Sequence, residues 1–222
     1  MGSLAKGVFI VAAKRTAFGA FGGHFKTVSC TDLASVAAKA ALAAGNVDPK
    51  IVDTVVVGNV IQSNRDTAYV SRHTGLRAGV PLDTPCLTVN RLCGSGFQAI
   101  ISGAQEIQLG EAQVALVGGA ENMSEAPFLV RDVRFGTQFG ADYKFEDMLW
   151  GTLTDHHIKT AMGMTAENLA QQYNITREEC DALAVRSQER WAAAYPAGAF
   201  REEMAPVLVK SRKGASSVDQ DQ

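Results

Sequence analysis

The sequence lacks the features that define several large classes of protein. No apolar run approaches the roughly 18 residues of a membrane-spanning helix. The formal net charge of -2 gives no bias towards nucleic acid. The four cysteines, Cys30, Cys86, Cys93 and Cys180, show neither metal-ligand spacing nor a disulfide-dense pattern. We therefore expect no membrane span, no bound metal and no nucleic-acid partner, and free thiols suit a reducing compartment.

The remaining composition is that of an ordinary globular protein. Hydrophobic residues make up 46% and charged residues 20% of 222 residues, enough for one large domain or two small ones. The paired His156 and His157 have no third ligand at a recognisable spacing, so the sequence does not favour a zinc site there.

Strands and helices are predicted to alternate along the first 120 residues. Apolar runs without alternation predict strands covered on both faces, and stripes at helical spacing predict helices between them. The expected strands cover 8–13, 51–61, 85–89 and 114–117, and the expected helices cover 31–44, with Thr31 as N-cap, 66–79 and 97–109. This βαβαβαβ order predicts the α/β class, with a mostly parallel sheet covered by helices.

The pattern changes near Asn122. Residues 124–159 have no clear period and predict a long excursion of functional importance. A helix follows at 165–173, and the capping box Thr176 to Glu179 predicts another, with Cys180, Leu183 and Trp191 on its buried face. A short strand is expected at 206–209. We therefore expect domains at 1–123 and 124–210 and a polar, fraying tail at 211–222.

Cys93 lies at a predicted corner between a strand and a helix. A helix start offers unpaired N–H groups and the positive end of a dipole, and both favour the nucleophilic thiolate. Gly94 and Gly96 permit a sharp turn and the close approach of a substrate carbonyl to the backbone. Nearby N–H groups would then hold a developing oxyanion. A buried cysteine that only packs in a tight turn fits the same residues, and the geometry alone leaves both interpretations open.

Four segments, in order, resemble the thiolase family. NRLCGSGFQ at 90–98 resembles its nucleophile motif, and GVFIVAAKRT at 7–16 its opening strand. GGAENMS at 118–124 and MGMTAEN at 162–168 resemble two further family segments. The resemblance covers nearly the whole chain, but the chain has only about half of the length that the family needs.

The resemblance implies an activity and a set of site residues. It implies thiolytic cleavage of 3-ketoacyl-CoA through an acyl-enzyme on Cys93, with CoA as a substrate and no permanently bound cofactor. Leu153 and Met162 match positions that line the acyl and pantetheine tunnel, and residues from 124 onward match the loop domain that covers the active site. The expected partners are acyl-CoA, CoA and further copies of the subunit, in a homodimer or homotetramer.

Two departures from the family pattern bear on function. Ala161 stands where short-chain acetoacetyl-CoA thiolases usually carry His, which favours a broad 3-ketoacyl-CoA substrate range. The family's GHP and C-x-G-G-G motifs, which supply a base and a second cysteine, do not occur in this sequence. We therefore expect little activity from the chain alone. The alternatives are a base from His156 or His157, a non-catalytic chain that only associates with partner subunits, and a ketosynthase of the same fold.

The N-terminus predicts a compartment. Residues 1–31 contain four basic residues and no Asp or Glu, a composition typical of mitochondrial import segments. Cleavage would remove the expected strand at 8–13. The resemblance to mitochondrial members of the family, whose import signal stays uncleaved, implies the mitochondrial matrix.

Overall fold

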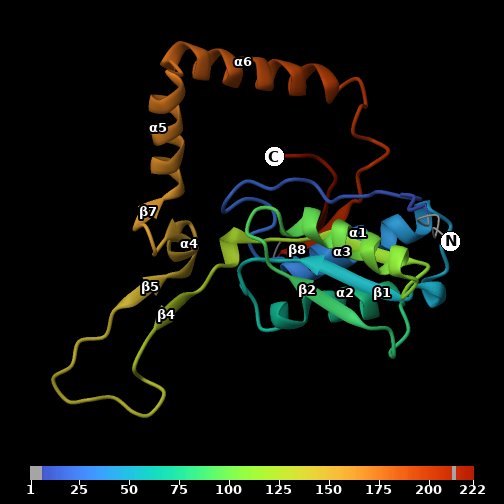
Figure 1. Cartoon of the computed structure of the whole chain (residues 1–222), viewed down its shortest axis with the longest axis horizontal. Helices are drawn as coiled ribbons and strands as arrows, with labels where there is room; N and C mark the ends of the chain where they lie inside the picture. Colours follow the sequence, from blue (N-terminus) through green and yellow to red (C-terminus); the bar gives the residue numbers. More distant parts are fainter. Residues whose placement is uncertain (1–6, 212–213) are drawn as a thin grey trace, which may run out of the picture. The chain divides into compact units, whose positions relative to one another are not determined.

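A three-stranded parallel sheet in the order β2-β1-β3 carries the turn that contains Cys93 (Figure 1). The structure is a computed structural model that describes residues 7–211 and 214–222. The central strand β1 (Thr54–Gly58) lies between β2 (Cys86–Val89) and β3 (Ala115–Gly119). Every residue of β1 is buried, as its uninterrupted valines predict for a strand covered on both faces. The expected α/β class and parallel pairing are confirmed.

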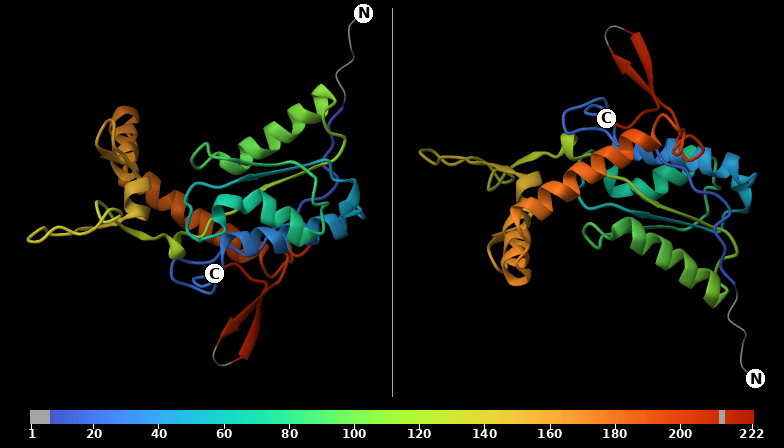
Figure 2. Two further views of the ribbon diagram at one scale, coloured as in Figure 1. Left: turned by 90° about the horizontal axis from the view of Figure 1, so that it is seen from below. Right: turned by 90° about the horizontal axis from the view of Figure 1, so that it is seen from above.

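Two crossover helices cover opposite faces of this sheet. α2 (Val70–Ala78) joins β1 to β2, and α3 (Ser95–Leu109) returns from β2 to β3. The two connections run in opposite directions across the sheet, and right-handed crossovers must then place their helices on opposite faces. Figure 2 shows α3 on one face and α2 with α1 (Cys30–Ala44) on the other. Three short 3₁₀ turns lie in the connections, η1 (Pro49–Ile51), η2 (Thr67–Tyr69) and η3 (Met123–Glu125).

The N-terminal part differs from the sequence prediction in two places. The expected strand at 8–13 is not formed, and Phe9 is 83% exposed. An apolar run becomes a strand only beside a partner, and β3 is paired with β1 alone within the described residues. Lys6, one of the four basic residues that predict an import segment, lies outside the described residues. In α1 the N-cap is Ser29, whose hydroxyl accepts the N–H of Asp32 at 3.0 Å, and not Thr31, which is buried inside the helix.

The end of the chain packs against its beginning. β8 (Val207–Ser211) and β9 (Gly214–Val218) form an antiparallel hairpin, whose Val207 and Val218 join a buried cluster with Ala17, Phe25 and Leu33. Asp221 accepts hydrogen bonds from Arg15 at 2.7 and 3.0 Å. The expectation of a frayed tail is therefore wrong for residues 214–222, and residues 212–213 lie outside the described part.

Residues 127–202 form a second compact unit, separate from the unit of residues 7–126 and 203–222. Its strands are β4 (Phe128–Val130), β5 (Phe145–Asp147), β6 (Thr154–Asp155) and β7 (Thr160–Ala161), and its helices are α4 (Met148–Thr152), α5 (Met162–Tyr173) and α6 (Arg177–Ala194).

The longest helix of this second unit starts where the sequence predicts but does not bury the predicted face. The capping box between Thr176 and Glu179 is confirmed. However, Cys180 is exposed, Leu183 is 57% exposed and Trp191 40%, because the described residues provide no element that covers this face of α6. No helix in the described part of the chain is long and apolar enough to cross a membrane.

Candidate active site

Cys93 lies in a tight turn between the end of β2 and the start of α3. The chain enters this turn at Asn90, and α3 begins at Ser95 with Gly94 as its N-cap. The Cys93 side chain is exposed. The carboxyl edge of a parallel sheet is where α/β proteins usually place ligand sites, so the turn presents its thiol at the favoured edge.

The four cysteines have different surroundings. Burial raises the pKa of the Cys30 and Cys86 thiols. Cys180 is exposed, but it lies in the first turn of α6 beside the acidic residues Glu178 and Glu179. The first turn of α3 carries no acidic residue. Among the four, Cys93 alone combines exposure with a helix start free of carboxylates, which favours the nucleophile interpretation over simple packing.

Backbone N–H groups around Cys93 are partly used and partly open. Gly94 donates to the carbonyl of Arg91 at 3.1 Å, and Ser95 donates to that of Leu92 at 2.9 Å. In the described residues no acceptor is paired with the N–H groups of Cys93 and Gly96. Unpaired N–H groups beside a thiol are the donors that a developing oxyanion needs.

A half-buried carboxylate fixes the neighbouring loop on the same edge of the sheet. Glu121 follows β3 and accepts the N–H groups of Val60 and Ile61 at 2.9 and 3.2 Å. Burial raises its pKa, although these hydrogen bonds act in the opposite direction. Its carboxylate also accepts from Asn59 at 3.1 Å. Glu121 is therefore a turn anchor, because its oxygens are occupied by the loop that follows β1.

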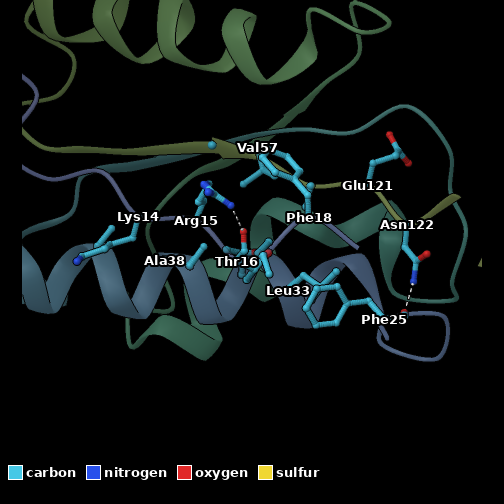
Figure 3. A pocket seen from close by; sticks show the side chains of 18 of the residues that line it. Lys14, Arg15, Thr16, Phe18, Phe25, Leu33, Ala38, Val57, Glu121 and Asn122 are labelled. Carbon is cyan, nitrogen blue, oxygen red and sulfur yellow. Dashed lines mark hydrogen bonds between the residues drawn. The ribbon is translucent and has the colours of Figure 1, made fainter. Parts of the chain in front are cut away.

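A cavity of about 610 Å³ lies in the first unit, lined by parts of α1, β3 and residues 10–21 (Figure 3). Its apolar lining includes Leu33 and Ala38 of α1 and Val57 of β1. Its charged lining includes Arg15 and Glu121. Cys93 does not line it. The cavity lies between residues 10–21 and β3, whose outer edge is unpaired in the described residues. We therefore attribute it to that open edge and not to the reaction site.

The other residues named from the sequence lie in the second unit. Leu153 is the C-cap of α4 and Met162 begins α5, and the N–H of Met162 donates to the carbonyl of Leu153 at 3.1 Å. These two residues are thus neighbours, while Cys93 belongs to the other unit. His156 and His157 are exposed in the turn between β6 and β7. Across residues 7–211 and 214–222, no group of three or more His, Cys, Asp or Glu side chains could hold a metal ion.

Sequence reasoning did not single out three residues around the turn. Ser95 and Asn90 bond to its backbone, and Gly58 lets α3 approach β1. Asn90 has a recognisable signal, because asparagine commonly bonds to the backbone two residues ahead. The role of Gly58 has none, because its neighbour Ser95 is 37 positions away in the sequence.

An exposed thiol at a helix start, at the carboxyl edge of a parallel sheet, is an arrangement suited to nucleophilic acyl transfer. The chain matches the family described as thiolase, N-terminal domain, over residues 8–222. The mitochondrial 3-ketoacyl-CoA thiolase of Mus musculus is 60% identical over 220 residues, which are 99% of this chain and 55% of that protein. The chain therefore belongs to the thiolase family.

Solved structures agree with this assignment. The crystal structure of human mitochondrial 3-ketoacyl-CoA thiolase has a TM-score of 0.95 at 57% identity, and the match covers 99% of this chain and 56% of the human one. The same human enzyme in complex with CoA has a TM-score of 0.93 at 57% identity, with 99% and 54% covered. The chain spans about half the length of the relatives that it matches.

Proposed function

We propose that this chain carries the nucleophile of an acetyl-CoA C-acyltransferase, a 3-ketoacyl-CoA thiolase of mitochondrial fatty acid β-oxidation. The observation that carries the proposal is Cys93, an exposed thiol at the start of α3 inside the segment that matches the thiolase N-terminal domain. The relatives are named mitochondrial 3-ketoacyl-CoA thiolases, and these names support the substrate class and a mitochondrial location. The compartment we propose within the mitochondrion is the matrix.

The proposed reaction runs through a thioester on Cys93. The Cys93 sulfur attacks the 3-keto carbon, and the carbon–carbon bond breaks to release the enolate of acetyl-CoA, which takes up a proton. The acyl group then passes from Cys93 to the thiol of CoA. Sulfur suits both steps because it is a good nucleophile and a good leaving group. Open N–H groups at Cys93 and Gly96 are placed to stabilise the oxyanion formed during attack.

The second unit supplies the substrate contacts in this proposal. Leu153 and Met162, which lie next to each other, line the path of the acyl chain and pantetheine. CoA enters as a substrate, with no permanently bound cofactor. The solved complex of the human enzyme with CoA supports CoA binding in the family. The working assembly is a homodimer or homotetramer.

Turnover requires proton transfers for which this chain has no matching family motif. The GHP and C-x-G-G-G motifs are absent from the 222 residues. A positioned acid or base typically contributes about 10²- to 10⁴-fold to rate. We therefore expect the isolated chain to accept an acyl group slowly on Cys93 and to show almost no thiolytic turnover.

The test separates the two steps. The purified chain is incubated with acetyl-CoA, and intact mass reports acetylation that hydroxylamine reverses. CoA-dependent loss of acetoacetyl-CoA absorbance reports turnover in parallel. Cys93→Ala is the variant that lacks the nucleophile, and Cys180→Ala is the matched control for the other exposed thiol. We expect acetylation in wild type and Cys180→Ala, none in Cys93→Ala, and turnover near background throughout.

Two results would contradict the proposal. Acetylation that persists in Cys93→Ala would show that another residue is the acceptor. Robust turnover that disappears in Cys93→Ala would show that the chain carries its own base, and substitution of His156 or His157 would then identify it.

A further inference from the structure

Leu92, the residue before the proposed nucleophile, has an unfavourable backbone conformation. Its φ is 49°, in the left-handed region that non-glycine residues rarely occupy. That conformation costs about 1–2 kcal/mol for an L-residue. The Leu92 side chain is 63% exposed, so packing of that side chain compensates little of the cost. Hydrogen bonds from the surrounding turn must therefore hold the residue in place.

The side chains of Asn90 and Ser95 form hydrogen bonds with the two polar backbone groups of Leu92. The side-chain oxygen of Asn90 accepts the N–H of Leu92 at 3.0 Å. The hydroxyl of Ser95 donates to the carbonyl of Leu92 at 2.6 Å and accepts the N–H of Arg91 at 2.9 Å. Both polar groups of Leu92 are thus engaged by the residues that flank the turn, and we call this pair the Asn90–Ser95 clamp.

The clamp is fixed to the sheet by close backbone packing. Ser95 is buried, with 4% of its surface exposed. A Cβ on Gly58 would lie 2.3 Å from the carbonyl carbon of Ser95, and a Cβ on Gly119 would lie 2.9 Å from the Cα of Gly96. Only glycines at the ends of β1 and β3 let the start of α3 approach this closely. Ser95 therefore holds Leu92 relative to the carboxyl edge of the sheet.

We propose that Asn90 and Ser95 are positioning residues that hold Leu92 in its left-handed conformation and thereby keep the Cys93 thiol at the start of α3. This inference rests on the proposed role of Cys93 as nucleophile. Without the clamp, Leu92 relaxes to an ordinary conformation, and the peptide that carries Cys93 turns away from the start of α3 and its open N–H groups.

The test uses three cysteines of the same chain as reporters. Iodoacetamide labelling with peptide mapping gives the rate of Cys93 relative to Cys180, the exposed thiol of the other unit, in one sample. Labelling of the buried Cys30 reports unfolding. Ser95→Ala removes the hydroxyl that bonds to both Leu92 and Arg91. We expect the Cys93 to Cys180 ratio to fall at least about threefold, because the loss of even one ordinary hydrogen bond changes an equilibrium by about threefold to tenfold. Cys30 should stay protected.

A matched control and a rescue separate positioning from general damage. Ser35 is also buried and donates to a backbone carbonyl at 2.6 Å, but within α1, so Ser35→Ala should leave the ratio unchanged. Leu92→Gly removes the conformational cost that the clamp opposes. We therefore expect the double variant Ser95→Ala with Leu92→Gly to recover towards the ratio of Leu92→Gly alone.

The labelling results distinguish failure of the clamp from failure of the proposed nucleophile. An unchanged ratio in Ser95→Ala with protected Cys30, or a double variant no better than Ser95→Ala, would overturn the clamp. Should Ser95→Ala expose Cys30, Asn90→Ala removes the other, exposed half of the clamp, and an unchanged ratio there overturns it as well. A wild-type ratio at or below one would instead remove the basis of the proposed nucleophile. That result is distinguishable because it concerns the unmodified chain.

Discussion

Single carboxylates fix both ends of the central strand β1. Before the strand, Asp53 accepts the N–H groups of Gln113 and Val114 at 2.8 and 3.0 Å. Beyond its far end, Glu121 accepts those of Val60 and Ile61. The two carboxylates have opposite environments, because Asp53 is exposed and Glu121 is half-buried. They therefore act on the pH dependence of stability in opposite directions.

The signs follow from the directions of the pKa shifts. Hydrogen bonds from Val114 and Gln113 hold the pKa of Asp53 below its usual value of 3.8. Its contribution is present above the unfolded pKa and is lost as pH falls through the folded pKa. Burial raises the pKa of Glu121 above its usual value of 4.5. Its contribution is present below the unfolded pKa and is lost as pH rises through the folded pKa.

We predict that Asp53→Asn lowers the free energy of unfolding in a pH-dependent way. The variant removes the charge but keeps the shape, so at pH 7 it should lower the free energy of unfolding by at most about 1 kcal/mol, since the group is exposed. The difference should shrink as pH falls below the unfolded pKa and through the lower folded pKa, where Asp53 itself becomes protonated. Urea unfolding at several pH values measures it. Asp83→Asn, at another exposed aspartate, is the control, and a difference that does not shrink as pH falls below 3.8 would contradict the prediction.

The seating of α3 on the sheet depends on glycines that lie far apart in the sequence. Gly58 ends β1 and Gly119 ends β3, and both face the first residues of α3. Gly118, directly beside Gly119, would carry a Cβ in open space. Gly118 has no close contacts, so it is a matched control for a substitution at Gly58.

We predict that Gly58→Ala is much more damaging than Gly118→Ala. A Cβ at Gly58 meets the backbone of Ser95 and Gly96 at 2.3 to 2.5 Å, and backbone atoms cannot rotate away. Overpacking of this kind costs about 1–3 kcal/mol or more, while Gly118→Ala should change stability by less than about 1 kcal/mol. Urea unfolding measures both variants. Equal stability of the two would show that α3 moves freely over the strand ends.

The first unit exposes several large apolar side chains. Phe9, Ile10 and Val11 are 83%, 79% and 72% exposed, and Phe97 of α3 is 71% exposed. Part of the apolar stripe that predicts the helix at 97–109 is uncovered in the described residues. Exposed apolar patches of this kind favour association with another surface.

We therefore predict that the purified 222-residue chain self-associates. Sedimentation should show species larger than 23.6 kDa at micromolar concentration. Phe9→Gln combined with Val11→Gln should weaken association at least about tenfold, because two apolar side chains lose their burial. Phe139→Gln, at an exposed aromatic of the second unit, is the control. A stable monomer in the wild type, or association unchanged in the double variant, would count against the prediction.

Local interactions determined what the sequence alone could predict. The valine run of β1, the left-handed Gly110 that ends α3 and the capping box of α6 depend on residues within a few positions of one another. The corner that presents Cys93 also follows from adjacent residues, and it stands where the pattern predicts.

Tertiary structure decided the features that depend on distant partners. The apolar run at 8–13 forms no strand because strand formation requires a neighbour, and residues 214–222 form ordered structure because Val218 and Asp221 find partners near Ala17 and Arg15. The close approach of Gly58 to Ser95 has no signature in any short stretch of sequence. It comes from a contact between two segments that only the folded chain brings together.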